Sequence, residues 1–124
     1  MAEVELTSFE VSLQNLMIAL EASNLDEAKA QIKELYPGEI SRLLEALQPK
    51  DRSILWPSIG ASIQGEVLKE VSEDVQSQLI SEMSVDTLVK ATAKLDTDDL
   101  ADIVPNLPES AVHSLLLTLD FKHR

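Results

Sequence analysis

The feature that most constrains the fold of this chain is a 24-residue repeat that runs through most of it. Apolar residues recur at this interval in two sets. The first set is Leu43, Val67, Ala91 and Leu115, followed by Leu47, Val71, Leu95 and Leu119. The second set is Leu55, Leu79 and Ile103, followed by Ile59, Met83 and Leu107. Such self-similarity is typical of solenoids, in which each unit buries its apolar face against its neighbours.

Each repeat fits two short helices joined by tight turns. The first helices are predicted near residues 39–47, 62–71, 86–95 and 109–119. The second helices are predicted near residues 49–56, 73–83 and 97–104. Their expected starts, one period apart, are Gln48, Ser72, Asp96 and Asp120. Prolines fit these boundaries, since a proline at a helix start costs no hydrogen bond: Pro49 and Pro108 lie at starts, and Pro57 and Pro105 at the ends of second helices.

The first 37 residues lie outside this repeat. A helix with Thr7 and Glu10 as a capping box is expected, with apolar spacing at Leu6, Phe9, Leu13, Leu16 and Leu20. A second helix is expected to start at the N-cap Asn24 and to stop before Pro37, burying Leu25, Ala28, Ile32 and Leu35.

The predicted fold is therefore all-α: a right-handed superhelical solenoid of short helical hairpins, armadillo-like, forming one domain over residues 1–124. Residues 1–37 would be a capping helix pair, and residues 38–124 the repeats. The last repeat breaks off after Asp120, so we expect the sequence to be part of a longer protein.

Charge and composition narrow the class of function. With 22 acidic and 10 basic residues the net charge is −12, which argues against nucleic acid or an anionic membrane as partner and favours cations or basic proteins. The chain has no Cys, and no apolar run approaches the roughly 18 residues of a membrane span. The acidic N-terminus lacks the basic segment of a signal peptide. A cytoplasmic location is expected.

The acidic segment 95–102 is the most distinctive local feature. Asp96 is suited to be an N-cap, and acids in a first helical turn suit the helix dipole. Asp102 is less easily explained, because it follows Asp98 by four residues on the same face, where like charges destabilise a helix by roughly 0.2–0.5 kcal/mol. Between Lys94 and Lys122 there are six acids and no Lys or Arg. Unpaired acids of this kind favour either solubility or a site for hard cations.

The sequence contains no recognisable catalytic motif. No Cys nucleophile, glycine-rich phosphate loop or HExxH motif occurs, and neither His113 nor His123 belongs to a triad-like pattern. We therefore expect no enzyme activity. Trp56 and Met83 fit core positions, and Gly65 inside a helix either permits a close helix approach or is neutral.

Two segments carry a resemblance to a known family: Leu-Leu-Glu-Ala-Leu-Gln-Pro-Lys-Asp-Arg at 43–52 and Asp-Asp-Leu-Ala-Asp-Ile at 98–103. They resemble the cytoplasmic N-terminal domain of MgtE-type magnesium channels. The resemblance implies a superhelix followed by CBS domains, a connecting helix and a transmembrane pore, assembled as a homodimer at the cytoplasmic face of the membrane. It implies a regulatory domain whose acidic face binds Mg²⁺ together with the CBS domains and closes the pore when Mg²⁺ is high.

The resemblance also implies a set of Mg²⁺ ligands: Glu66 on a first helix, and Asp98 and Asp102 on a second helix. Gly65 stands where the family usually has Ala. The remaining ligands would come from the CBS domains. The alternative is an adaptor for protein–protein contact, similar to the middle domain of flagellar motor switch proteins.

Overall fold

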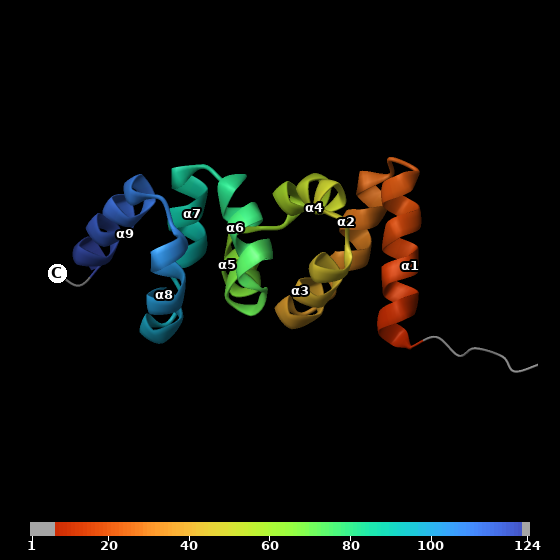
Figure 1. The fold of residues 1–124 in the computed structure, drawn as a ribbon, viewed down its shortest axis with the longest axis horizontal. Coiled ribbons are helices and arrows are strands. Elements are labelled where there is room, and N and C mark those ends of the chain that lie inside the picture. The colour runs from red at the N-terminus through yellow and green to blue at the C-terminus, as the bar shows by residue number, and fades with distance from the viewer. Residues whose placement is uncertain (1–6, 123–124) are drawn as a thin grey trace, which may run out of the picture.

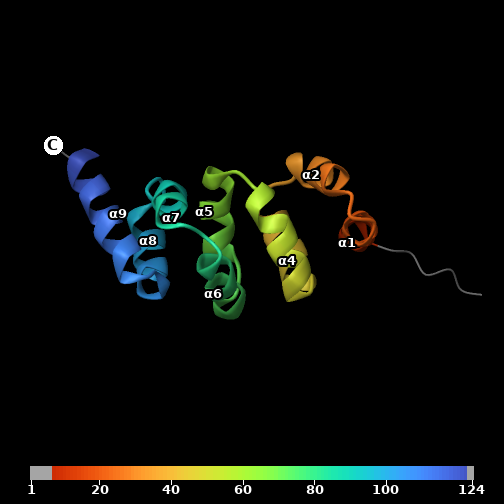
Figure 2. The same cartoon turned by 90° about the horizontal axis from the view of Figure 1, so that it is seen from above.

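The computed structural model describes residues 7–122, with side chains as far as Leu119. The secondary-structure elements of this part of the chain are all helices, and they follow one another along one long axis from α1 to α9 (Figures 1 and 2). The α-helices are α1 (Ser8–Glu21), α2 (Leu25–Lys33), α3 (Pro37–Ala46), α4 (Pro49–Leu55), α5 (Ala61–Glu70), α6 (Glu73–Ser81), α7 (Val85–Thr92), α8 (Thr97–Ile103) and α9 (Glu109–Lys122). Two 3₁₀ turns, η1 (Trp56–Ser58) and η2 (Val104–Asn106), follow α4 and α8. The prediction of an all-α fold is confirmed.

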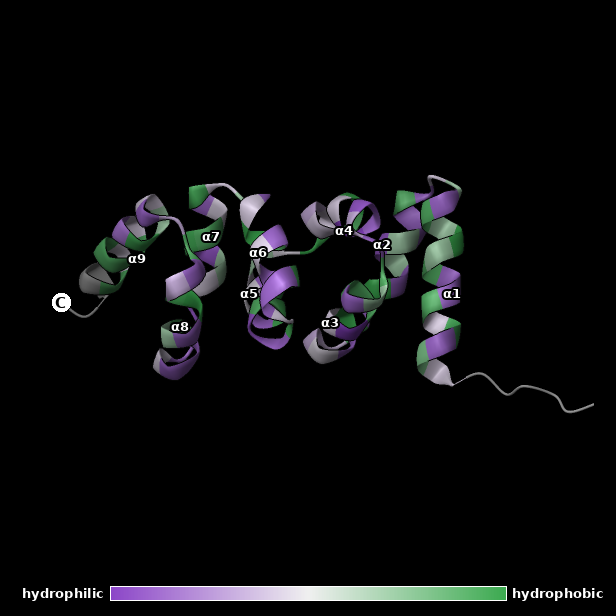
Figure 3. Cartoon of the chain, in the orientation of Figure 1, coloured by the Kyte–Doolittle hydropathy of each residue, from purple (hydrophilic) through white to green (hydrophobic). Residues whose placement is uncertain are grey.

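The first helices of successive repeats pack on one another: α3 on α5, α5 on α7, and α7 on α9. The repeated apolar positions face these contacts, and Leu43, Val67, Ala91 and Leu115 are all buried. Leu55, Leu79 and Ile103 on the second helices are fully buried as well. Hydrophobic and hydrophilic residues alternate around each helix, as expected for elements that bury one stripe (Figure 3). Residues that are 24 positions apart therefore occupy equivalent buried positions in successive repeats.

The predicted helix starts are correct in position at Gln48, Ser72 and Asp96, where the backbone is extended before α4, α6 and α8. None of these three side chains makes a capping hydrogen bond. The expectation that the side chain of Asp96 caps α8 is therefore wrong. The N-terminal pair does use its caps: Thr7 Oγ1 accepts a hydrogen bond from the Glu10 amide and Asn24 Oδ1 accepts one from the Glu27 amide, each at 3.1 Å.

Asp120 is not a helix start, so that prediction is wrong. The last helix, α9, continues without a break from Glu109 to Lys122. In the earlier repeats the chain becomes extended at Leu47 and Val71, which ends the first helix. Pro49 follows Leu47 closely, whereas no proline or glycine follows Pro108. Leu6 and His123 lie outside the described residues.

The prolines act as helix boundaries. Pro37 and Pro49 are the first residues of α3 and α4, while α2 has already ended at Lys33. Pro57 and Pro105 lie inside η1 and η2, immediately after α4 and α8 have ended. Each second helix that carries such a proline therefore tightens into a 3₁₀ turn at that point.

Candidate cation-binding surface

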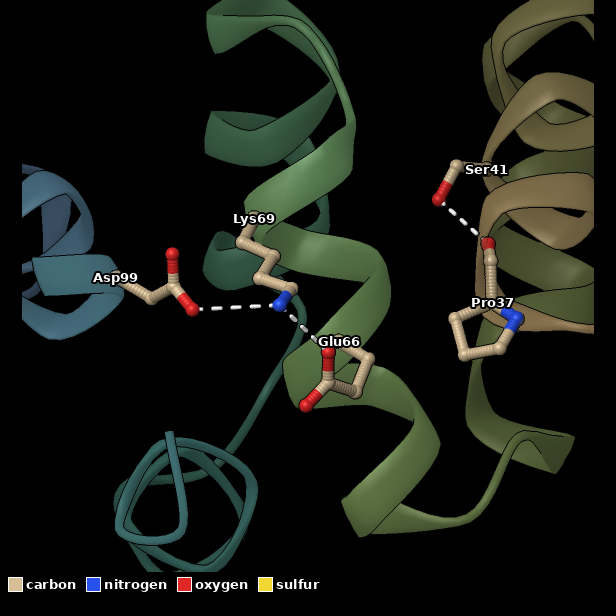
Figure 4. A network of polar contacts seen from close by, with 5 residues as sticks. All are labelled: Pro37, Ser41, Glu66, Lys69 and Asp99. Carbon is tan, nitrogen blue, oxygen red and sulfur yellow. Dashed lines mark hydrogen bonds and ion pairs between the residues drawn. The ribbon is translucent and has the colours of Figure 1, made fainter. Parts of the chain in front are cut away.

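One lysine forms two ion pairs at the contact between α5 and α8. Lys69 Nζ lies 2.9 Å from Glu66 Oε2 on the same helix and 3.2 Å from Asp99 Oδ2 in the first turn of α8 (Figure 4). The hydrogen bond to Glu66, and then that to Asp99, raises the pKa of Lys69 above its ordinary value of 10.5. The side chain is therefore an ammonium ion at neutral pH, seated between two carboxylates.

The position of Lys69 repeats a connection made one unit earlier. Glu45 lies 24 residues before Lys69, and its Oε1 accepts a hydrogen bond of 2.7 Å from the backbone amide of Ser72, at the start of α6. In both cases the end of a first helix reaches the start of the second helix in the next repeat. An acid suits the bare amides of a helix start, whereas the carboxylate of Asp99 requires a base.

This pairing corrects the interpretation of the acids between Lys94 and Lys122 as unpaired. Asp99 is paired by a lysine that precedes it by 30 residues, and Glu66 shares that lysine. Sequence reasoning missed the pair, although the 24-residue interval between Glu45 and Lys69 was a usable signal. Asp98 and Asp102 are exposed on α8 and form no ion pair among the described side chains.

The predicted ligands do not form a complete metal site by themselves. Among residues 7–122, no three or more His, Cys, Asp or Glu side chains are arranged to hold a metal ion. The donors available on α8 are the two exposed carboxylates of Asp98 and Asp102, and on α5 the carboxylate of Glu66, which Lys69 contacts. Carboxylate oxygens are the protein ligands that Mg²⁺ prefers, and this ion usually takes only one or two of them and keeps several waters. The donor set therefore fits part of a Mg²⁺ site.

Gly65, beside Glu66, proves to be a point of close approach. A Cβ added to Gly65 would overlap the carbonyl oxygen of Ala91 on α7 and come within 2.9 Å of the carbonyl carbon. The glycine thus brings α5 against the backbone of α7, and the interpretation of Gly65 as neutral is wrong. Glu66 therefore lies next to the point where α5 approaches the backbone of α7.

The other sequence predictions concern packing. Trp56 is buried and Met83 is partly buried against the core, as expected, and His113 is exposed. None of the described helices has the length and apolar character required to cross a membrane.

Comparison with protein families matches residues 35–124 to the family described as the MgtE intracellular N domain. Comparisons with curated proteins and with solved structures find no match. The matched segment begins just before α3 and includes every helix of the 24-residue repeat.

Proposed function

Because the chain belongs to the MgtE intracellular N domain family, we propose that it is the regulatory, Mg²⁺-sensing domain of a magnesium transporter. The family is one of transporter domains and not of enzymes. It supports this function over the alternative of a general adaptor similar to the flagellar motor switch middle domain. The match over residues 35–124 is the observation that carries the proposal.

The proposed mechanism uses the acidic face of α8. Asp98 and Asp102 are exposed, lie one helical turn apart and are not neutralised by a described basic side chain. Such carboxylates repel any second acidic surface unless cations lie between them. In the proposed closed state Mg²⁺ bridges them, and Glu66, to CBS domains of the same polypeptide. Loss of Mg²⁺ then separates the two surfaces and opens the pore.

The finer architecture belongs to the same proposal. The helix stack would be a right-handed armadillo-like superhelix, and the full-length transporter a homodimer with this domain at the cytoplasmic face of the membrane. A bound ion shifts the equilibrium between open and closed states only by its differential affinity for them, so ions that bridge two domains favour closure.

The test is Mg²⁺-dependent pore closure in the full-length transporter carrying Asp98→Asn or Asp102→Asn. Each variant should require more Mg²⁺ for closure, because each removes one carboxylate ligand while keeping the shape of the side chain. Asp86→Asn is the matched control, since Asp86 is an exposed acid in the first turn of α7. The proposal would be contradicted if both α8 variants closed at the same Mg²⁺ concentration as wild type. It would also be contradicted if Asp86→Asn changed that concentration equally.

A further inference from the structure

Glu66 and Asp99 already share a cation. Their carboxylate oxygens lie 2.9 Å and 3.2 Å from the same ammonium nitrogen, although they belong to helices from different repeats. The side chains of Lys69 and Asp99 are 27% and 31% exposed, so the contact lies at the surface and is reachable by ions from solution. Figure 4 shows Asp99 reaching from α8 toward the lysine nitrogen, which has a carboxylate on either side of it.

We propose that Lys69 is a built-in competitor for the divalent cation at Glu66. An ammonium ion and a hydrated divalent cation seek the same carboxylate oxygens. An ion that binds Glu66 must therefore displace Lys69 or approach against its charge. This inference rests on the proposed function, since it takes Mg²⁺ as the ion that the surface binds.

The competition divides the predicted ligands into two groups. Asp98 and Asp102 form no described ion pair and are open to an ion at once, whereas Glu66 is engaged by Lys69. Lys69 thus raises the Mg²⁺ concentration at which Glu66 is occupied and has a much smaller effect on Asp98 and Asp102. When an ion does bind Glu66, Lys69 remains paired with Asp99, so the α5–α8 contact is kept.

The magnitude follows from Coulomb attraction. A unit charge a few ångströms away changes the binding constant of a monovalent ion roughly fivefold in water, and that of a divalent ion by more. Removal of the Lys69 charge should therefore lower the apparent Mg²⁺ dissociation constant at Glu66 by about fivefold or more. Asp98 and Asp102 serve as an internal control, because their affinity for Mg²⁺ should change much less.

The experiment is a Mg²⁺ titration of the chain at constant ionic strength, followed by NMR of the side-chain carboxyl carbons of Glu66, Asp98, Asp99 and Asp102. Lys69→Gln is compared with Lys69→Arg, which keeps the charge and the pair. It is also compared with Lys50→Gln, which removes an exposed lysine on α4 that lies outside the pair. Mn²⁺ in place of Mg²⁺ gives a second readout, the broadening of nearby signals.

In the expected result Glu66 saturates at a lower Mg²⁺ concentration in Lys69→Gln alone, and Lys69→Arg behaves as wild type. The proposal would be supported equally if Mg²⁺ saturated the Glu66 signal in Lys69→Gln but did not saturate it in wild type. An unchanged Glu66 response in Lys69→Gln, saturable or not, would overturn it, as would an equal change in Lys50→Gln. The proposed function fails separately: it is lost if Asp98→Asn and Asp102→Asn leave closure intact, whatever Lys69 does.

Discussion

Gly65 of α5 and Ala91 of α7 are in backbone contact, because the carbonyl group of Ala91 fills the place where a Cβ on residue 65 would stand. Glycine inside a helix costs up to about 1 kcal/mol relative to alanine. The contact explains why this cost is tolerated here. Since α5 also carries Glu66 and Lys69, the same approach fixes the helix from which the candidate ion surface is built.

Gly65→Ala should therefore destabilise the fold despite its better helix propensity. Forcing extra volume into a packed contact costs about 1–3 kcal/mol, and the obstacle here is backbone that cannot rotate away. Subtracting the propensity gain of about 1 kcal/mol leaves a net loss of up to about 2 kcal/mol. Urea denaturation followed by circular dichroism measures this loss.

Gly38→Ala provides the matched control, because no atom lies within 4 Å of a Cβ added to Gly38 in α3. This variant should be neutral or gain up to about 1 kcal/mol from propensity alone. If Gly65→Ala were as stable as Gly38→Ala, the close contact between α5 and α7 would not exist in solution.

The repeat predicted the core well because packing in a stack follows the same interval as the sequence. Leu43, Val67, Ala91 and Leu115 are buried for this reason. The pairing of Lys69 with Asp99 could not be obtained from the acid-rich segment alone. Counting charges along the chain leaves Lys69 outside the region between Lys94 and Lys122, whereas the fold brings α8 back against α5. The prediction at Asp120 is wrong because the period was extended to a position where the helix continues.

A second periodic feature is a side chain that reaches back to the carbonyl group eight residues earlier. Arg52 Nε donates to the Leu44 carbonyl at 2.6 Å, and Gln76 Nε2 donates to the Leu68 carbonyl at 2.8 Å. Both carbonyl groups lie near the C-terminal ends of first helices, where the regular amide partner four residues later is missing. The Leu44 carbonyl also accepts a hydrogen bond of 3.2 Å from the Leu47 amide. One period later stands Leu100, which has no donor to offer.

Gln76→Leu should lower the free energy of unfolding by about 1–2 kcal/mol, because one buried and one partly buried partner are left without a hydrogen bond. These partners are the Leu68 carbonyl and Asn106 Nδ2, which donates to Gln76 Oε1 at 2.6 Å. A double-mutant cycle with Asn106→Leu isolates the second bond. The double variant should lose less than the sum of the two single variants, and strict additivity would count against this hydrogen bond.

The turn between α1 and α2 holds the one non-glycine residue with positive φ in the described chain, Ser23 at 56°. Around it the amide of Asn24 donates to the Ala19 carbonyl and the amide of Ser23 to the Leu20 carbonyl. This is the Schellman arrangement that usually ends a helix with glycine. Ser23→Gly should therefore stabilise the N-terminal helix pair, by about 1 kcal/mol at most. The melting temperature measures it, and a decrease would show that the serine side chain matters more than the backbone strain.

The charge of Lys69 gives a prediction for the dependence of stability on pH. Hydrogen bonds to Glu66 and then Asp99 raise its pKa in the folded state above the ordinary value of 10.5. A lysine with a raised folded-state pKa stabilises the fold at every pH below its unfolded value, and that stabilisation is lost only as the pH rises through the folded value. The difference in unfolding free energy between wild type and Lys69→Gln should therefore stay constant from neutral pH to 10.5 and shrink above it.

Urea midpoints of the two proteins, measured across this alkaline range, give the difference directly. Lys50→Gln serves as the comparison, because it removes the same charge on α4, outside the contact between α5 and α8. This comparison separates the loss of the pair from the loss of one positive charge. If the difference in unfolding free energy between wild type and Lys69→Gln already declined between neutral pH and 10.5, the folded protein would not hold Lys69 in its charged form. The competition proposed at Glu66 would then lack its cation.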